Sequence, residues 1–264
     1  MHKNYLPIAI EAAVKAGEVI MKIYNSDMEV DFKEDNSPLT AADQSANTLI
    51  NSFLNTTPYP IISEENKNAS YEERKKWTRC WIVDPLDGTK EFIKRNGEFT
   101  VNIALVSKGK PLLGVIYVPV TRELYFTGTS MKKAYKVVVG KDFFITQNLL
   151  EEAVAIGPSS YVNPPKLIVG SRSHLNQDTQ DYVDVLKKEG DVHIVSKGSS
   201  LKFCLVAEGK AHQYPRFAPT MEWDTAAGQA ICEAVGLKVI DRTTGRSLKY
   251  NKENLLNPHF LVTS

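Results

Sequence analysis

Cysteine is scarce in this chain, and long apolar runs are absent. The 264 residues contain three cysteines, Cys80, Cys204 and Cys232, which are widely spaced and outside any C-x-x-C pattern. An odd, scattered set disfavours both a disulfide framework and a zinc site, and it is compatible with a reducing compartment. The most apolar stretch, residues 111–120, is far shorter than the roughly 20 residues that cross a bilayer.

The chain also has no excess of positive or negative charge. Lys and Arg total 32 against 31 Asp and Glu, so the formal net charge is +1. Extended nucleic-acid binding needs a basic face, so we expect no such partner, whereas a small anionic ligand needs only a local basic pocket. Glu11, Lys15 and Glu18 interrupt the first apolar segment, so no signal peptide is expected there. We expect a cytoplasmic protein without a transmembrane segment. Loose attachment to the inner face of the membrane, and the choice between monomer and homodimer, stay open.

The strongest chemical signal is the segment 84–89, which reads Asp-Pro-Leu-Asp-Gly-Thr. The apolar residues 80–83 before it predict a buried strand that ends at Pro85, because proline has no amide donor. Two carboxylates then stand three residues apart, and Gly88-Thr89 is expected to open a short helix. Carboxylates at a strand end chelate hard cations such as Mg²⁺, and amides at a helix start bind phosphate oxygens. The segment therefore predicts metal-assisted phosphate chemistry.

Hydrophobic periodicity predicts the elements around this segment. Helices are expected over residues 5–23 and 39–54, a short strand over 59–62, and an antiparallel meander of strands over 99–139. The polar segment 67–76 is interpreted as a surface excursion.

Beyond residue 165 the pattern alternates between strands and helices, which is typical of α/β structure. The expected strands are 166–170, 192–195 and 211–214, and the expected helices are 177–188, 200–208 and 223–235. We place a boundary between an α+β part over residues 1–145 and an α/β part over residues 146–264.

Four carboxylates are candidates for a single site. They are Glu64, Asp84, Asp87 and Asp224. Glu64 and Asp84 each follow an apolar strand, so a shared sheet edge would bring them together. Asp224 stands at the mouth of an apolar helix whose small residues permit close packing. Each Asp alone could be a helix cap, since Asp is a favoured N-cap residue. As a set they predict metal ligands, because carboxylate clusters concentrate at functional sites.

The order of these motifs resembles the inositol monophosphatase superfamily of Mg²⁺-dependent, lithium-sensitive phosphatases. Its pattern is an Asp, then Glu-Glu, then Asp-Pro-(Ile/Leu)-Asp-Gly-Thr, then Trp-Asp before paired alanines. This chain shows Asp43, Glu64-Glu65, residues 84–89 and residues 223–227 in that order over nearly its full length. The resemblance implies an α/β fold of the layered αβαβα sandwich type.

The resemblance also implies a metal site. Its ligands would be Glu64, Asp84, Asp87 and Asp224, joined by the main-chain carbonyl of Leu86. The site would hold two or three Mg²⁺ ions, and Li⁺ would inhibit. Two divalent ions about 4 Å apart can activate a water and neutralise the leaving oxygen in an in-line displacement.

Around the metals, the resemblance implies a catalytic pair, Asp43 and Thr89. The Asp would hold the Thr hydroxyl so that the hydroxyl can take up the water's proton. The amides of Gly88 and Thr89 would hold the phosphate, and Asp224 would also contact the substrate. Glu65 could support the ligands or be a solvated neighbour.

Residues 90–105 resemble bacterial 3'(2'),5'-bisphosphate nucleotidases more than inositol monophosphatases, which usually carry Asn-Phe after the Thr. This subgroup implies removal of the 3'-phosphate of adenosine 3',5'-bisphosphate, a by-product of sulfate activation, to give AMP and phosphate. Gly198 and Lys202 would supply an amide and a charge for the second phosphate, although Lys202 could be a solvated helix lysine. Ser171 and His174 match nucleotide-contacting positions in eukaryotic relatives, although His174 could merely cap a helix.

Two alternatives stay open. One is an inositol-1-phosphate or fructose-1,6-bisphosphate phosphatase, against which the residues 90–96 weigh. The other is a catalytically silent metal- or nucleotide-binding homologue, although every inferred ligand is present. The segments 67–76 and 141–152 fit the resemblance least.

Overall fold

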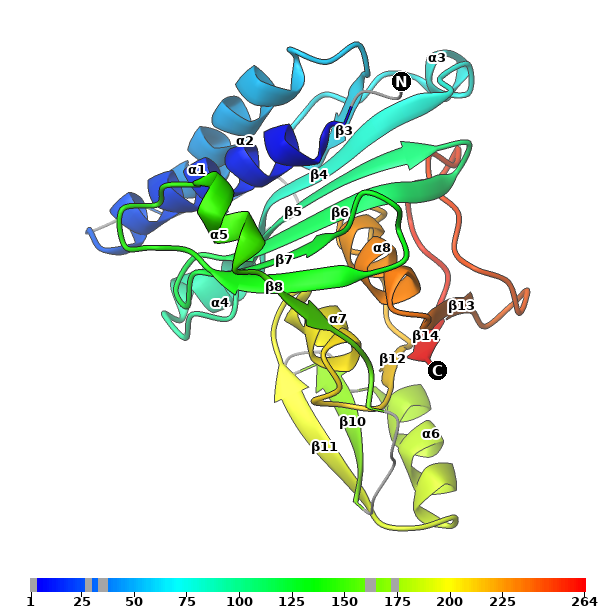
Figure 1. Ribbon diagram of the computed structural model, residues 1–264. Coiled ribbons are helices and arrows are strands. Elements are labelled where there is room, and N and C mark those ends of the chain that lie inside the picture. The colour runs from blue at the N-terminus through cyan, green and yellow to red at the C-terminus, as the bar shows by residue number, and fades with distance from the viewer. Residues whose placement is uncertain (1–3, 27–29, 33–37, 160–164, 172–175) are drawn as a thin grey trace.

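A seven-stranded sheet organises the first part of the computed structural model, which describes residues 4–26, 30–32, 38–159, 165–171 and 176–264 (Figure 1). Its strands, in spatial order, are β3 (Ile61–Ser63), β4 (Arg79–Asp87), β5 (Thr100–Ser107), β6 (Lys110–Val118), β7 (Glu123–Thr127), β8 (Ala134–Val138) and β9 (Val154–Ile156). β3 pairs parallel with β4, and every later pair is antiparallel. The predicted meander is therefore confirmed.

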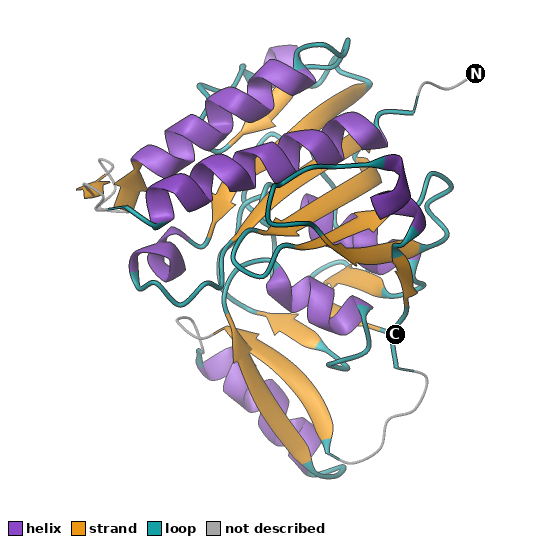
Figure 2. Cartoon of the chain, turned by 60° about the vertical axis from the view of Figure 1, so that its left-hand side comes forward, coloured by secondary structure: helices purple, strands orange, loops and turns teal. Residues whose placement is uncertain are grey.

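Helices cover both faces of this sheet. α1 (Leu6–Tyr24) and α2 (Ala41–Leu54) lie side by side on one face, and α7 (Leu201–Ala207) and α8 (Ala226–Ala234) lie on the other (Figures 1 and 2). In β4, Trp81 and Val83 belong to the first core, whereas Cys80 and Ile82 belong to the second. Because successive strand residues point to opposite faces, a strand buried on both sides reads as a continuous apolar run.

A smaller sheet forms the far side of α7 and α8. It consists of β12 (Tyr214–Arg216), β14 (Phe260–Thr263) and β13 (Lys238–Asp241) in antiparallel order. The parallel pair β10 (Lys166–Ser171) and β11 (Val192–Lys197) continues it, because a parallel bridge joins Ile168 to Gln213. α6 (Gln177–Lys187) packs its apolar side on this pair. The layers are thus α1/α2, sheet, α7/α8, sheet and α6, which confirms the αβαβα sandwich.

The small residues of α8 allow the close approach that the sequence predicts. A Cβ added to Gly228 would lie 2.3 Å from Phe203 Cγ on α7, and one added to Gly114 on β6 would lie 2.5 Å from the Ala227 carbonyl oxygen. Both distances are too short for a real Cβ contact, so α8 is seated directly on β6 and α7. α8 begins at Ala226, two residues after Asp224, so this packing holds the start of α8 close to the sheet.

Several predicted boundaries are wrong. β4 does not end at Pro85 but runs to Asp87, with a register break between Asp84 and Asp87. A proline is tolerated there because the ladder is interrupted and the Leu86 amide donates to the Asp84 side chain (3.1 Å). β12 begins three residues after the predicted strand at 211, and α8 begins three residues after the predicted helix at 223.

The segment 67–76 is more than a surface excursion. It contains the short helix α3 (Tyr71–Arg74), and the Arg74 side chain is buried. The remaining elements are β1 (Val30–Phe32), β2 (Pro38–Thr40), α4 (Thr89–Ile93) and α5 (Gln147–Glu151). The boundary at residue 145 stays a prediction, and β9, which lies beyond it, pairs with β8. Among the described residues, no helix is long and apolar enough to cross a membrane.

Candidate functional site

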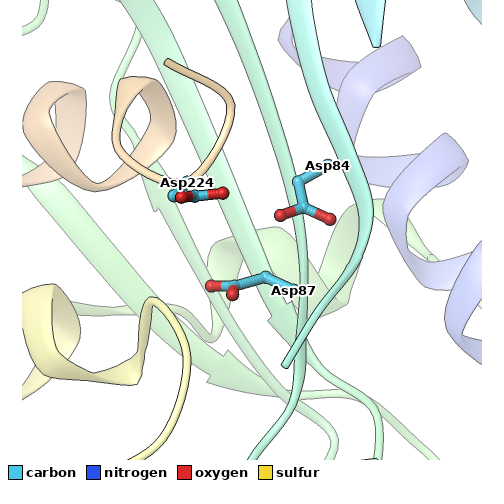
Figure 3. A group of neighbouring side chains, drawn as sticks. All are labelled: Asp84, Asp87 and Asp224. Carbon is cyan, nitrogen blue, oxygen red and sulfur yellow. The ribbon is translucent and has the colours of Figure 1, made fainter. Parts of the chain in front are cut away.

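Three carboxylates meet where the register of β4 breaks (Figure 3). One oxygen from each of Asp84, Asp87 and Asp224 lies within 4.8 Å of the other two. Asp84 and Asp87 come from β4, and Asp224 comes from the loop before α8. We call these three residues the acidic cluster. The sequence predicted their grouping although Asp224 lies 137 positions after Asp87 in the chain (224 − 87 = 137).

Glu64 lies beside this cluster. Ser63 on β3 pairs with Val83 on β4, and the Glu64 amide donates to the Val83 carbonyl (3.2 Å). Glu64 therefore follows its strand in register with Asp84. Its side chain is exposed and is not part of the group whose oxygens lie within 4.8 Å.

The electrostatics of the acidic cluster favour a bound cation. Burial, followed by the charges of Glu64 and Asp87, raises the pKa of Asp84 well above its ordinary value. Burial, then Asp87 and Glu64, raises the pKa of Asp224 to about 8. A divalent cation would reverse these shifts, because an opposite charge stabilises the ionised carboxylates. An all-oxygen donor set of this kind fits hard divalent cations such as Mg²⁺.

Two polar residues that the sequence analysis did not single out hold the cluster together. Asp87 Oδ2 accepts hydrogen bonds from the Ser200 amide (2.6 Å) and lies 2.7 Å from Ser200 Oγ. Ser200 Oγ is also 2.9 Å from the Asp224 carbonyl and accepts from Asn102 Nδ2 (2.8 Å). Ser200 thus links β4 to the loop that carries Asp224. The one sequence feature that could have indicated these contacts is Asn102, a polar residue inside an otherwise apolar strand.

The predicted catalytic pair lies at the same end of the sheet. Thr89 is the first residue of α4, and its Oγ1 lies 3.5 Å from the Leu86 carbonyl oxygen. Gly88 precedes it with φ 94°, a left-handed conformation that glycine adopts readily. Asp43 is buried in the first turn of α2, and its negative charge is among the causes that raise the pKa of Asp84.

Lys202 on α7 is buried, so it is not a solvated lysine. Its side chain is buried on α7, and Nζ donates to the carbonyls of Ser199 (2.5 Å) and Lys197 (3.3 Å). The ammonium also lies 5.5 Å from the centre of the Tyr214 ring. Burial lowers the pKa of Lys202 to about 8, and the nearby carboxylate charges oppose this shift.

Arg216 on β12 is a second cation, which the sequence analysis missed. After burial, its positive charge is a further cause of the lowered pKa of Lys202, and it also opposes the raised pKa of Asp224. Its Nη2 donates to the Pro219 carbonyl (3.0 Å). Within the described part of the chain, its buried Nε has no hydrogen-bond partner. Two cations are therefore close enough to the acidic cluster to interact with its charges.

Comparison with known proteins decides the family. A profile of the inositol monophosphatase family matches residues 1–262. The chain belongs to the inositol monophosphatase family. It is 47% identical over 258 residues to the 3'(2'),5'-bisphosphate nucleotidase CysQ of Salmonella typhimurium, and the match covers 96% of this chain and 97% of that protein. It is 46% identical, with the same coverage, to the protein of that name from Escherichia coli K12.

Solved structures agree with this assignment. The crystal structure of CysQ from Bacteroides thetaiotaomicron, described as a bacterial member of the inositol monophosphatase family, has a TM-score of 0.87 and 52% identity to this chain. The match covers 98% of this chain and 96% of that one. Inositol monophosphatase family proteins are metal-dependent, and the acidic cluster is consistent with that property.

Three further residues of this inositol monophosphatase family member were predicted to contact substrate: Gly198, Ser171 and His174. The Gly198 amide donates to Glu98 Oε2 (2.8 Å), and Lys197 Nζ donates to Glu98 Oε1 (3.1 Å). Glu98 thus anchors the loop before α7. The Gly198 amide, predicted to bind the second phosphate, is bonded to Glu98 here, and its contact with substrate stays a prediction. Ser171 ends β10, but its side chain and the whole of His174 lie outside the described residues, so both stay predictions.

Proposed function

We propose that the chain is a Mg²⁺-dependent phosphomonoesterase that converts adenosine 3',5'-bisphosphate to AMP and phosphate. The observation that carries this proposal is the position of two cations, Lys202 and Arg216, beside a cluster of three carboxylates. The carboxylates suit the metal ions that a phosphate reaction needs, and the cations suit a second phosphate. The proposal is supported by relatives of 46% and 47% identity that are named 3'(2'),5'-bisphosphate nucleotidases.

Asp84, Asp87 and Asp224 would hold the cations, with Glu64 and the Leu86 carbonyl completing the set. Divalent ions there supply charge neutralisation for the phosphate and lower the pKa of an attacking water. The protein's part is to hold several carboxylates at short range, and the Ser200 bonds to Asp87 fix the position of one of them.

Thr89 and Asp43 would move the proton. The Thr89 hydroxyl, 3.5 Å from the Leu86 carbonyl oxygen, would take a proton from the attacking water and pass its own to Asp43. The amides of Gly88 and Thr89 would hold the phosphate, since helix starts present such donors to anions.

Lys202 and Arg216 would bind the phosphate that is not cleaved. Lys202 has a pKa of about 8, so it carries a proton below that pH, and a bound dianion would raise this pKa further. Arg216 would supply a second positive charge near Lys202 for the same anion. Inositol 1-phosphate has no second phosphate to use these cations.

The resemblance of the motifs extends the proposal. We expect Li⁺ to inhibit at the cation site, and we expect a cytoplasmic role in clearing a by-product of sulfate activation. The Mg²⁺ and Li⁺ dependence can be read in one phosphate-release assay with and without each ion.

Selectivity between substrates tests the assignment. Phosphate release is measured for adenosine 3',5'-bisphosphate, inositol 1-phosphate and fructose 1,6-bisphosphate in wild type, Lys202→Met, Arg216→Met and the control Lys210→Met. Lys210 is an exposed lysine just beyond the far end of α7. We expect the first two variants to lose about 10- to 100-fold in kcat/KM on the nucleotide, because charge-assisted bonds to phosphate are lost, and the control to match wild type. The proposal would be contradicted if the wild-type protein preferred inositol 1-phosphate or fructose 1,6-bisphosphate to the nucleotide.

A further inference from the structure

A buried carboxylate precedes Asp224 in the loop before α8. Glu222, two residues earlier, has no exposed surface (0%). Its Oε2 accepts the Asn251 amide (2.5 Å), and its Oε1 accepts both the amide (3.0 Å) and the ammonium (2.5 Å) of Lys252. The proposed catalytic steps do not use Glu222, so its burial needs another explanation.

Arg74 also binds residues 251–253. Its Nη1 donates to Asn251 Oδ1 and to the Lys252 carbonyl (both 2.9 Å). Its Nη2 donates to the Glu253 carbonyl (3.1 Å), and Asn251 Nδ2 donates back to the Arg74 carbonyl (2.8 Å). Arg74 as a whole residue is 4% exposed. The peptide groups of residues 251–253 therefore donate to a buried anion and accept from a buried cation.

Such an arrangement is costly to build from isolated charges, because each buried charge must be fully hydrogen-bonded. Both charges affect the buried thiol of Cys80. Burial and then the charge of Glu222 raise its pKa to about 12, and the charge of Arg74 opposes this rise. The hydrogen bonds of Arg74 and Glu222 to residues 251–253 therefore connect α3 to the loop before α8.

The backbone of Glu222 determines the shape of the loop that carries Asp224. The Glu222 amide donates to the Leu255 carbonyl (2.9 Å), and its carbonyl accepts from the Thr225 (3.2 Å) and Ala226 (3.0 Å) amides. Asp224 lies between these anchor points. The loop must be held, because Asp224 faces two carboxylates that repel it and it does not belong to their sheet.

The other end of the network reaches the Glu64 side of the site. Arg74 Nε donates to the Ala69 carbonyl (3.0 Å). One residue earlier, Asn68 Nδ2 donates to the carbonyl of Ser63 (3.2 Å), which immediately precedes Glu64. Both sides of the metal site are thus connected to Arg74 outside the site.

We propose that Glu222 and Arg74, joined through residues 251–253, are positioning residues that hold Asp224 against the repulsion of Asp84 and Asp87. They thereby set the affinity of the acidic cluster for divalent cations. This inference rests on the proposed function, since it assumes that the cluster binds a metal ion. It also gives the segment 67–76 a role, as the part of the chain that carries Arg74.

The test is Mg²⁺ binding by titration calorimetry to the full chain, together with its thermal midpoint without metal. The variant is Glu222→Gln, which keeps the shape of the side chain and removes its charge. The matched control is Glu208→Gln, which alters another buried carboxylate that binds a lysine, Lys136 (3.0 Å), at the end of α7. We expect Glu222→Gln to weaken Mg²⁺ binding about 10- to 100-fold, as changes in groups that orient metal ligands do. The control should lower the thermal midpoint and leave the Mg²⁺ affinity unchanged.

Asn251→Gly is a milder second variant. Asn251 has φ 59°, a conformation that glycine adopts without strain, so only the side-chain bonds to Arg74 are removed. We expect a smaller loss of Mg²⁺ affinity in the same direction. Combined with Glu222→Gln it should add little, because residues that act through one network are not additive.

The outcomes separate the two proposals. If wild type binds no Mg²⁺, the metal site itself is refuted, and the positioning role falls with it. If wild type binds Mg²⁺ and both variants bind it equally well while their thermal midpoints fall like that of the control, the network is only structural and the inference is overturned.

Discussion

Asp224→Asn should make the metal-free protein more stable, although it removes a side chain proposed to be essential. Burial, then the charges of Asp87 and Glu64, raises the pKa of Asp224 from 3.8 to about 8. Because this folded-state pKa is above the unfolded one, the stabilising contribution is full below about pH 4 and is lost as the pH rises through about 8. An asparagine does not ionise, and its side-chain oxygen can still accept the Met221 amide, which lies 2.8 Å from Asp224 Oδ2.

The magnitude follows from the pKa shift. A shift from 3.8 to about 8 corresponds to a ceiling on the order of 5 kcal/mol at pH 8. The Asp224 side chain is only partly buried, and solvent screening reduces this ceiling, so we expect about 2 kcal/mol.

The assay is urea unfolding in the presence of a chelator at pH 5 and pH 8. The control is Asp184→Asn, which changes a half-exposed carboxylate of α6. The free energy of unfolding should fall more steeply with rising pH in wild type and in the control than in Asp224→Asn. Added Mg²⁺ should then stabilise wild type at pH 8 and have little effect on Asp224→Asn. Parallel pH profiles for all three proteins would refute the electrostatic argument.

Three further substitutions follow from the same structure. Asp84→Asn should nearly abolish phosphate release and leave the circular dichroism spectrum unchanged; wild-type turnover would refute its role as a metal ligand. Gly228→Ala should lower the free energy of unfolding by about 1–3 kcal/mol, because the new Cβ would lie 2.3 Å from Phe203 Cγ; a neutral result in urea unfolding would argue against the close contact. Trp81→Phe should cost about 1–2 kcal/mol in the same assay, since the buried bond from Nε1 to Thr57 Oγ1 (2.8 Å) is lost; unchanged stability would contradict that contribution.

Much of the fold could be predicted because its signals are local. The strands of the meander are short β-rich runs separated by turns, and the helices α1 and α6 have clear apolar periodicity. The continuation of β4 past Pro85 was not predictable in this way. It depends on the neighbouring strand β5, with which Asp87 resumes pairing opposite Thr100 after the register break. The order of layers entered through the resemblance of the motifs rather than through periodicity.

The site was predictable where a motif names the residue, as for Asp84, Asp87 and Asp224. Ser200 and Arg216 carry no such mark, because their importance arises only from tertiary contact. Ser200 meets Asp87 across 113 positions of sequence, and Arg74 meets Asn251 across 177. Neither spacing nor composition indicates such contacts, so the supports of the acidic cluster had to be read from the structure.

The products formed from adenosine 3',5'-bisphosphate test the central claim most directly. The full chain is incubated with this nucleotide and Mg²⁺, and the products are separated by chromatography and identified by phosphorus NMR. We predict AMP and inorganic phosphate in equal amounts, with no product when a chelator replaces Mg²⁺. Adenosine 3'-phosphate as the product, or no phosphate release with Mg²⁺ present, would contradict the account.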